Sequence, residues 1–295
     1  MKDERNTRKG LKVLVLSLMV ILILALFLVI VYFNADISSK SPEKMEEGIE
    51  ITEYEYQQRK VFCLVPEGKI DYTILYVHGG SYLGELTQEH WDFCKKIAKD
   101  TSAAVVIPDY PLAPKYDYQD VFSMMIPFYQ ELIQKINIEH LIVMGDSAGG
   151  GLVLALMETM GEQSSPMPQK TILLSPWLDV TMTNPEISEI EKNDTELNRA
   201  SLILAGNLYA GKEGLTSYLV NPINGPLENL KNVTIYTGTY DMLNPDAHLL
   251  VEKASKVGVN IELRETAKAT HIWMLKQENP LAKQTYEDIV SLIKQ

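Results

Sequence analysis

Short apolar runs alternate with amphipathic stretches along most of this chain. Runs of strand length, rich in β-branched and aromatic residues, lie at 59–65, 72–77, 103–107, 141–144, 171–174, 233–237 and 259–263. Apolar residues at helical spacing predict helices at about 88–100, 119–136, 148–160, 244–257 and 280–294. Several predicted strands are almost continuously apolar, which is typical of strands buried on both faces. The pattern therefore predicts an α/β fold with a mostly parallel central sheet and helices on both faces.

One segment, residues 179–222, interrupts this alternation. It contains the polar stretch DVTMTNPEISEIEKNDTE and a further predicted helix near 199–210. So long a connection between two strands is either a decorated loop or a lid over a functional site. We expect residues 179–222 to form a small cap.

The most apolar part of the chain is residues 13–33, where only Ser17 lies outside the apolar and aromatic set. As a helix, these 21 residues would span about 31 Å, close to the thickness of the hydrocarbon core of a bilayer. A cleaved signal peptide normally has a shorter apolar core of about 7–15 residues, and a helix buried in a soluble domain is rarely apolar on all sides. The sequence therefore favours a single transmembrane helix.

Basic residues precede this apolar run. Residues 1–12 hold five Lys or Arg against two acidic residues, so the positive-inside rule predicts that the N-terminus is cytoplasmic. The expected organisation is a basic cytoplasmic N-terminus at 1–12, a transmembrane anchor at 13–33, a stalk or partial cap at 34–54 and a folded domain at 55–295. The expected location is the cell membrane, with the folded domain extracellular.

Composition narrows the classes of function. Apolar residues make up 46% of the chain, which is ample for a packed core, and the net charge of −12 argues against a nucleic-acid partner. The two cysteines, Cys63 and Cys94, are too few for a disulfide scaffold or a Cys-rich zinc site. We expect two buried thiols, although a single bridge stays open if the domain lies in an oxidising compartment. Nothing in the sequence indicates the oligomeric state.

A candidate nucleophile lies in the pentapeptide Gly145-Asp146-Ser147-Ala148-Gly149. This G-x-S-x-G pattern directly follows the predicted strand LIVM and opens an apolar helix, which is the strand–turn–helix context of a nucleophile elbow. Small flanking residues are needed because the turn is strained and crowded. The N-terminus of the following helix favours negative charge developing near the serine hydroxyl.

A second glycine-rich turn, His78-Gly79-Gly80-Ser81-Tyr82, directly follows the predicted strand YTILYV. Consecutive small residues let main-chain N–H groups point into a cavity, so two of them, together with the amide of Ala148, would form an oxyanion hole. We interpret His78 as a structural residue that braces the loop. It precedes Ser147 in the chain, whereas the expected base follows it.

A serine nucleophile needs a histidine base and an acid that orients it. Only His248 and His271 follow Ser147, and His271 is favoured because it comes just after the last predicted strand, while His248 lies inside a predicted helix. Asp241 closes the strand VTIYTGTYD and is the favoured acid, with Asp246 as the alternative.

Taken together, these motifs resemble the hormone-sensitive-lipase-like α/β-hydrolases. The resemblance covers about residues 55–295 and rests on motifs in the same order: HGGSY, DYPLAP at 109–114, GDSAGG at 145–150, LLSPWLD at 173–179, Asp241 and His271. It implies an α/β-hydrolase fold with an eight-stranded sheet, a cap, and ester hydrolysis without a cofactor or metal. Asp179, in LLSPWLD, is interpreted as structural.

The resemblance also implies a role for each matching residue. Ser147 is the nucleophile, Asp241 the acid and His271 the base. The amides of Gly80, Ser81 and Ala148 form the oxyanion hole, and Gly79 gives the loop its freedom. This chain departs from the family pattern at Ser81, which replaces the third glycine of the usual HGGG motif, and at Ile272-Trp273 after the base.

The predicted function is a membrane-anchored serine carboxylesterase that hydrolyses small to medium acyl esters of small molecules. A deacetylase or amidase would use the same triad, because both reactions pass through an acyl-enzyme. A catalytically idle homologue that binds a small molecule is the alternative of another class, and the presence of all three triad members argues against it. A true lipase is less favoured, since the chain beyond the N-terminus is strongly acidic.

Overall fold

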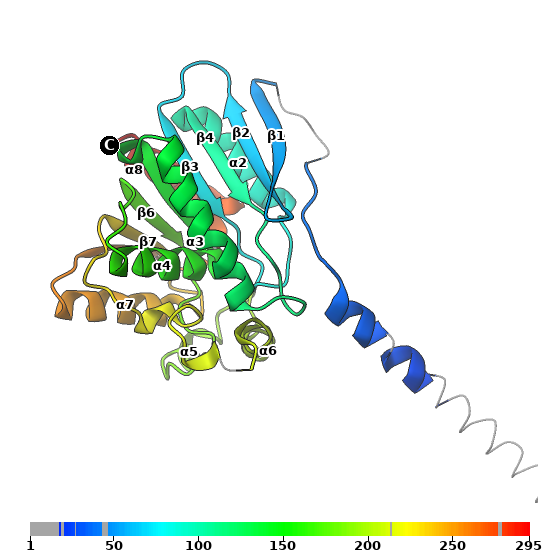
Figure 1. The fold of residues 1–295 in the computed structure, drawn as a ribbon. Coiled ribbons are helices and arrows are strands. Elements are labelled where there is room, and N and C mark those ends of the chain that lie inside the picture. Colours follow the sequence, from blue (N-terminus) through cyan, green and yellow to red (C-terminus); the bar gives the residue numbers. More distant parts are fainter. Residues whose placement is uncertain (1–17, 19–20, 27, 43–46, 213, 277–278) are drawn as a thin grey trace, which may run out of the picture. The chain divides into compact units, whose positions relative to one another are not determined.

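The computed structural model describes residues 18, 21–26, 28–42, 47–212, 214–276 and 279–295. The chain divides into two compact units, Met1–Asp36 and Ile37–Gln295. The eight strands of the second unit, shown in Figure 1, are β1 (Ile49–Tyr56), β2 (Arg59–Pro66), β3 (Tyr72–Val77), β4 (Ala103–Pro108), β5 (Leu141–Asp146), β6 (Lys170–Leu174), β7 (Val233–Gly238) and β8 (Ile261–Thr266).

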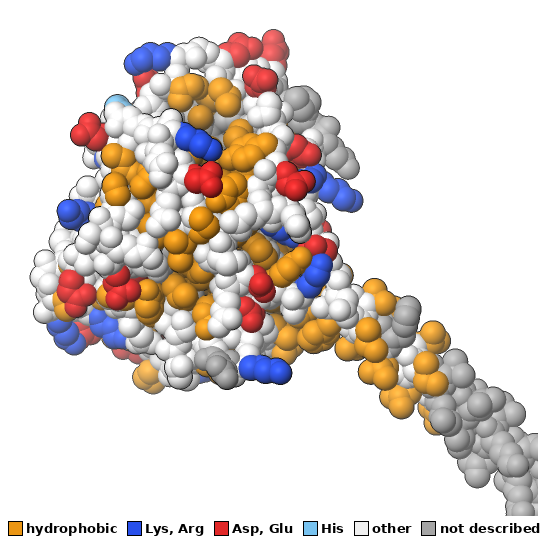
Figure 2. All heavy atoms as spheres, viewed as in Figure 1, with side chains coloured by type: hydrophobic (Ala, Val, Ile, Leu, Met, Phe, Trp, Pro, Cys, Tyr) orange, Lys and Arg blue, Asp and Glu red, His pale blue; other side chains and the backbone are white. Residues whose placement is uncertain are grey.

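Of the described residues in the N-terminal unit, 18, 21–26 and 28–34 are helical. The large apolar side chains of these helical residues are exposed, as the orange spheres of this unit in Figure 2 show. No helix formed by the described residues is long and apolar enough to cross a membrane. The predicted basic terminus at 1–12, and residues 13–17, 19–20 and 27 of the predicted anchor, lie outside the described residues, so the anchor stays a prediction.

The sheet has the strand order β1-β2-β4-β3-β5-β6-β7-β8. Strands β3 to β8 are parallel to one another, whereas β2 is antiparallel to both β1 and β4. The prediction of a mostly parallel sheet is therefore confirmed. Parallel strands all present their carboxyl ends at one edge, and that edge is where ligands bind in such sheets.

Helices cover both faces of the sheet: α2 (Gln88–Thr101), α3 (Tyr118–Lys135), α4 (Ser147–Glu162), α7 (Asn244–Lys256) and α8 (Pro280–Lys294). Side chains alternate across each strand. In β3, Leu75 and Val77 belong to the apolar cluster formed with α3, α4 and α7, while Ile74 and Tyr76 belong to the cluster formed with α2 and α8. This two-sided burial explains why the predicted strands are continuously apolar.

The region predicted as a stalk, residues 34–54, contains a strand that the sequence analysis did not recognise. β1 pairs with β2 from Ile49 opposite Pro66 to Tyr56 opposite Arg59, so the expected boundary at residue 55 lies inside β1. Its signal was the alternation in IEITEYEY. β1 is an edge strand with most of its side chains exposed, and its three glutamates make the sequence look like that of a polar linker. Charged side chains are common on edge strands, because they discourage pairing with another chain.

The insertion at 179–222 contains two helices, α5 (Ile187–Ile190) and α6 (Arg199–Ala210), and α6 has the predicted bounds. The side chain of Asn198 accepts a hydrogen bond from the N–H of Ser201 and so caps the start of α6. The helix buries Leu202, Ala205 and Tyr209, while Leu204 is exposed.

Candidate active site

Ser147 lies at the junction of β5 and α4, in the strained turn that the sequence predicted. Its φ is +50°, a left-handed conformation that is unfavourable for a residue other than glycine. The turn leaves no room around it, because a Cβ added to Gly149 would lie 2.1 Å from the carbonyl oxygen of Val77. The N–H of Trp177, in the loop that follows β6, donates to the carbonyl of Ser147 at 2.8 Å. This hydrogen bond holds the turn in place.

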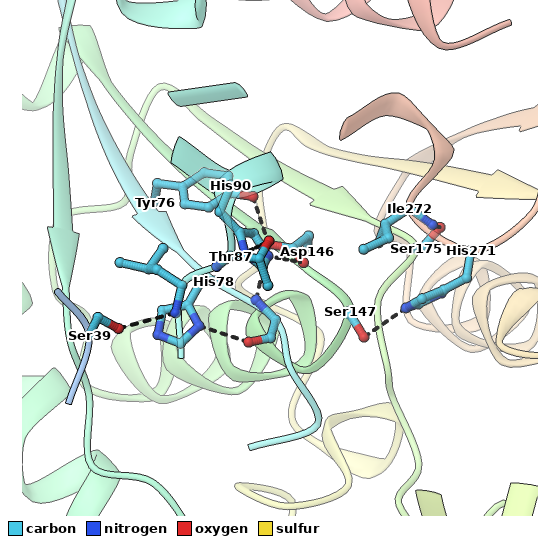
Figure 3. A network of polar contacts seen from close by, with 12 residues as sticks. Ser39, Tyr76, His78, Thr87, His90, Asp146, Ser147, Ser175, His271 and Ile272 are labelled. Atoms are coloured by element: carbon cyan, nitrogen blue, oxygen red, sulfur yellow. Dashed lines mark hydrogen bonds and ion pairs between the residues drawn. The ribbon is translucent and has the colours of Figure 1, made fainter. Parts of the chain in front are cut away.

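The three residues predicted as a triad lie in one hydrogen-bonded line. His271 Nε2 is 2.9 Å from Ser147 Oγ, and His271 Nδ1 is 2.9 Å from Asp241 Oδ2. Figure 3 shows the side chains of Ser147 and His271 pointing toward each other. Asp241 is fully buried after β7, and its second oxygen accepts the N–H of Leu243 at 2.9 Å. Both carboxylate oxygens are therefore held, so the imidazole has a fixed partner.

The environment of His271 sets its protonation. Burial disfavours the imidazolium, but the facing carboxylate of Asp241 outweighs that effect and raises the pKa of His271 above its ordinary value. Because Asp241 accepts from Nδ1, the neutral imidazole carries its proton there and leaves Nε2 free to take a proton from Ser147.

The glycine-rich loop lies directly against the turn that carries Ser147. A Cβ on Gly79 would lie 2.4 Å from Asp146 Oδ2 and 2.9 Å from Ser147 Cβ, so only glycine fits. Gly80 and Ser81 both have positive φ, at +106° and +56°, and in the described part of the chain neither N–H has a hydrogen-bond partner. Ala148, in the first turn of α4, has an N–H without an intrahelical acceptor. These N–H groups are available to an oxyanion.

A second polar group, centred on Asp146, was not recognised from the sequence. Its Oδ1 accepts from the hydroxyl of Tyr76 at 2.6 Å and from the N–H of Gly79 at 3.0 Å, and its Oδ2 lies 3.2 Å from His90 Nε2 (Figure 3). Burial disfavours the charged forms of both Asp146 and His90. The attraction between the carboxylate and the imidazolium outweighs that effect, so the pKa of Asp146 is lowered and the pKa of His90 is raised. The signal available in the sequence was a carboxylate at the end of a buried strand, directly before Ser147.

His78 has the structural environment that the sequence analysis expected. Its Nδ1–H donates to the carbonyl of Gly79 at 2.7 Å, and its ring stacks on Tyr110 with centroids 4.6 Å apart. Burial, together with the charge of nearby His90, lowers the pKa of His78 to about 4. A neutral ring braced in this way supports the loop and is not placed to act as the base.

The alternative base and acid lie elsewhere. His248 is exposed on α7, where its Nε2 is 2.7 Å from Glu265 Oε1. Asp246 is buried, and its Oδ1 accepts from the side chain of Asn184 at 2.8 Å. Neither has a hydrogen bond to Ser147 or His271. Burial raises the pKa of Asp246 to about 6.

Asp179 stabilises its own loop. Its Oδ1 accepts from the N–H of Thr181 at 2.9 Å and from the Thr181 hydroxyl at 2.6 Å. This is the structural role that the sequence analysis expected. No group of three or more metal-ligating side chains capable of holding a metal ion occurs among the residues that the structure describes.

The insertion contacts the loops that carry the site. Tyr209 of α6 stacks on Tyr82, which ends the glycine-rich loop, with centroids 3.6 Å apart and planes 8° from parallel. Asp194 accepts the N–H of Met242, the residue after Asp241, at 2.8 Å. These contacts place parts of the insertion against both the glycine-rich loop and the loop that carries Asp241.

Ser175, at the end of β6, is another residue that the sequence analysis did not single out. Its hydroxyl accepts the N–H of Ile272 at 3.2 Å, so it fixes the residue that follows His271 (Figure 3). Ile272 has a φ of +43° and needs such support. The contact joins positions 97 residues apart, so no local pattern marks it.

Comparison with known proteins finds relatives whose names describe ester-hydrolysing enzymes. An esterase of Acinetobacter venetianus is 29% identical over 228 residues, which cover 73% of this chain and 72% of that protein. An acetyl-hydrolase of Streptomyces hygroscopicus is 26% identical over 202 residues, with 68% of each chain covered. The structure of a hormone-sensitive lipase from a metagenome library superposes with a TM-score of 0.80 at 28% identity, covering 85% of both chains.

A family model described by its alpha/beta hydrolase fold matches residues 74–275, which include the glycine-rich loop, Ser147, Asp241 and His271. This match spans more than half of the chain. The chain therefore belongs to the α/β-hydrolase fold family, in its hormone-sensitive-lipase-like group.

Proposed function

We propose that this carboxylic ester hydrolase uses Ser147 as its nucleophile, with His271 as the base and Asp241 as the orienting acid. The observation that carries the proposal is the line of two hydrogen bonds, each 2.9 Å long, from Ser147 through His271 to Asp241. A reactive serine needs a base within hydrogen-bond reach and a third group that orients the base. The geometry supports both requirements.

In the first half of the reaction, His271 Nε2 takes the proton of Ser147 Oγ as that oxygen bonds to the ester carbonyl carbon. The carbonyl oxygen becomes an oxyanion, and the amides of Gly80, Ser81 and Ala148 donate to it. The carbon–oxygen bond to the alcohol then breaks, and His271 returns the proton to the leaving alkoxide. The product is an alcohol and an acyl group esterified to Ser147.

In the second half, His271 takes a proton from water as the water oxygen attacks the acyl carbon. The same amides stabilise the second oxyanion, the bond to Ser147 Oγ breaks, and His271 returns the proton to it. The carboxylic acid leaves and the enzyme is restored. No external oxidant or reductant is needed, because water supplies every atom that is added.

We propose small to medium acyl esters as substrates. The aromatic rings of Tyr82, Trp177 and Tyr209 are fully buried beside the glycine-rich loop, which supports a restricted rather than a broad apolar site. The names of two relatives, an esterase and an acetyl-hydrolase, support the same range.

The test uses the full chain with p-nitrophenyl esters of increasing acyl length, beside acetylated sugars and amides. Ser147→Ala and His271→Ala should each lower kcat by about 10⁴ or more, and the double variant should lose little further because the residues act as a unit. His248→Ala is the matched control and should keep wild-type kcat. Full activity in Ser147→Ala would overturn the assignment of the nucleophile, and better turnover of amides than of esters would overturn the substrate class.

We also propose that residues 13–33 anchor the protein in the cell membrane, with the catalytic unit outside. The support is the basic flank at 1–12 and the exposed apolar side chains of the described residues in this range. The full-length protein should fractionate with membranes and keep its N-terminus, and protease added to intact, wall-stripped cells should digest the catalytic unit. Recovery of a soluble form that starts near Asp36 would contradict the anchor.

A further inference from the structure

The segment Ile37–Ser39, which we call the N-terminal strap, is built into the catalytic unit. It lies within the region predicted as a stalk, yet Ser39 is only 1% exposed. The hydroxyl of Ser38 donates to Asp109 Oδ2 at 2.7 Å, and the N–H of Ser39 lies 3.1 Å from both oxygens of the same carboxylate. The strap therefore supplies two hydrogen-bond donors to one buried acid.

Asp109 is the first residue of the DYPLAP motif and is completely buried. Arg59 at the start of β2 pairs with it at 3.3 Å, and the same guanidinium group donates to the carbonyl of Ile37 at 2.9 Å. Arg59 also donates to the main-chain carbonyl of Asp109 at 2.9 Å. Arg59 and the strap thus hold the carboxylate and main chain of Asp109 from two sides.

The strap and its partner contact both sides of the glycine-rich loop. On one side, the hydroxyl of Ser39 accepts the N–H of Leu86, in the loop that leads from Tyr82 to α2 (Figure 3). On the other side, Tyr110, which follows Asp109, donates its hydroxyl to the carbonyl of His78 at 2.8 Å and stacks on the His78 ring. The residues that flank Gly79, Gly80 and Ser81 are therefore tied to Ile37–Ser39.

We propose that the N-terminal strap is a positioning element of the active site: Ser38 and Ser39 hold the Asp109 loop and Leu86 so that the amides of Gly80 and Ser81 point at the developing oxyanion. This inference rests on the proposed function, since it assumes that those amides stabilise an oxyanion. It assigns to the first residues of the catalytic unit a role in catalysis.

Substitutions in the N-terminal strap should act on the position of the glycine-rich loop. Ser38→Ala removes the hydroxyl donor to the buried carboxylate of Asp109, and Ser39→Ala removes the acceptor of the Leu86 N–H, while the main-chain N–H of Ser39 stays in place. The loop can shift to recover these bonds. Oxyanion stabilisation depends steeply on donor placement, and removing one donor outright costs about 100-fold or more in kcat. A partial shift of the donors should therefore lower kcat by about 10-fold to 100-fold.

The test compares full-length Ser38→Ala, Ser39→Ala and the double variant with Ser41→Ala as the matched control. Ser41 lies three residues after Ser38 and two after Ser39, and its hydroxyl donates to exposed Glu53 instead of the Asp109 loop. Active sites are counted with an organophosphate, so that kcat refers to folded, reactive enzyme. We measure kcat, KM, the melting temperature and the inhibition constant of a trifluoromethyl ketone, which forms a tetrahedral adduct with the serine.

The double variant should lose kcat by about 10-fold or more, with KM within about 2-fold, and the inhibition constant should rise in parallel with the loss of kcat/KM. Ser38→Thr keeps the hydroxyl and should restore the rate lost in Ser38→Ala, while Ser41→Ala should match wild type. A lower melting temperature with unchanged kcat per reactive site would overturn the positioning role and leave a stabilising one. The proposed function itself fails only if Ser147→Ala stays active in the same assays, which separates the two conclusions.

Discussion

Asp146 Oδ1 accepts the main-chain N–H of Gly79 at 3.0 Å. Asp146 directly precedes the proposed nucleophile, and Gly79 directly precedes the proposed oxyanion donors, so this one bond joins the two parts of the site that must act on the same carbonyl group. The carboxylate is in turn held by Tyr76 and His90. The relative position of the proposed nucleophile and the proposed oxyanion donors therefore depends on this buried charged group.

The first prediction concerns that group. Asp146→Ala leaves the N–H of Gly79, the hydroxyl of Tyr76 and the ring of His90 without their partner, so the free energy of unfolding should fall by about 3–5 kcal/mol. Its kcat should fall as well, because the loop loses its tie to Ser147. Asp146→Asn keeps one acceptor oxygen and should lose less of both quantities. Urea unfolding and ester hydrolysis measure these effects, and wild-type stability in Asp146→Ala would contradict the prediction.

The second prediction concerns pH. In the proposed mechanism the neutral form of His271 is the base, and the pKa of His271 is raised above its ordinary value of about 6.5. The value of kcat/KM should therefore rise with pH, with its midpoint above about 6.5. Asp241→Asn removes the charge that raises this pKa and leaves burial, which lowers it, so the midpoint of the residual activity should move down. Measuring kcat/KM between about pH 5 and about pH 9 checks the shift. An unchanged midpoint in Asp241→Asn would show that Asp241 does not set the pKa of the base.

The third prediction separates Asp246 from Asp241. The pKa of Asp246 is raised from 3.8 to about 6, so the folded state holds its proton more tightly than the unfolded chain does. The protonated carboxyl group of Asp246 therefore contributes stability to the folded state at low pH, and this contribution is lost as pH rises through about 6. Asp246→Asn should raise the free energy of unfolding near pH 8 by about 1–2 kcal/mol, flatten its pH dependence and keep most activity.

Asp241→Asn is the matched change for this experiment and should lose most activity without that gain in stability. Chemical unfolding at about pH 5 and about pH 8, with kcat measured in parallel, distinguishes the two carboxylates. An inactive Asp246→Asn variant beside an active Asp241→Asn variant would reverse the assignment of the acid.

The fourth prediction concerns the insertion. Tyr209→Leu removes the ring that stacks on Tyr82 but keeps an apolar side chain under α6. Because Tyr82 ends the glycine-rich loop, we expect kcat/KM for longer acyl esters to change by about 5-fold or more, while that for acetyl esters stays within about 3-fold. Leu204→Ala, on the exposed face of α6, should leave the preference unchanged. A collapse of acetyl-ester turnover in folded Tyr209→Leu would instead indicate that α6 supports the chemistry itself.

The sequence by itself was sufficient to predict the strands and helices that a local pattern of apolar residues encodes. Continuous apolar runs indicated the central strands because parallel strands are buried on both faces, and helical spacing indicated α2, α3, α4, α6, α7 and α8 to within a few residues. The edge strand β1 was missed because only part of it is buried. Its apolar and polar residues therefore alternate too weakly to stand out from the surrounding glutamates. The three candidate catalytic residues could be proposed because each follows a strand of the parallel sheet, at the edge where ligands bind. Ser147 follows β5 directly, while Asp241 and His271 lie in the loops after β7 and β8.

Only the tertiary structure decided which distant residues support that site. His90 and Asp146 are 56 positions apart, Ser39 and Asp109 are 70 apart, and the partners of Asp194 and Ser175 are also far along the chain. Serine, aspartate and histidine occur throughout the sequence in exposed positions, so their type carries no sign of burial or of partner. Their roles arise when the sheet brings the strand ends together and removes water from the spaces between the loops, because a buried polar group must then find its partner within the protein.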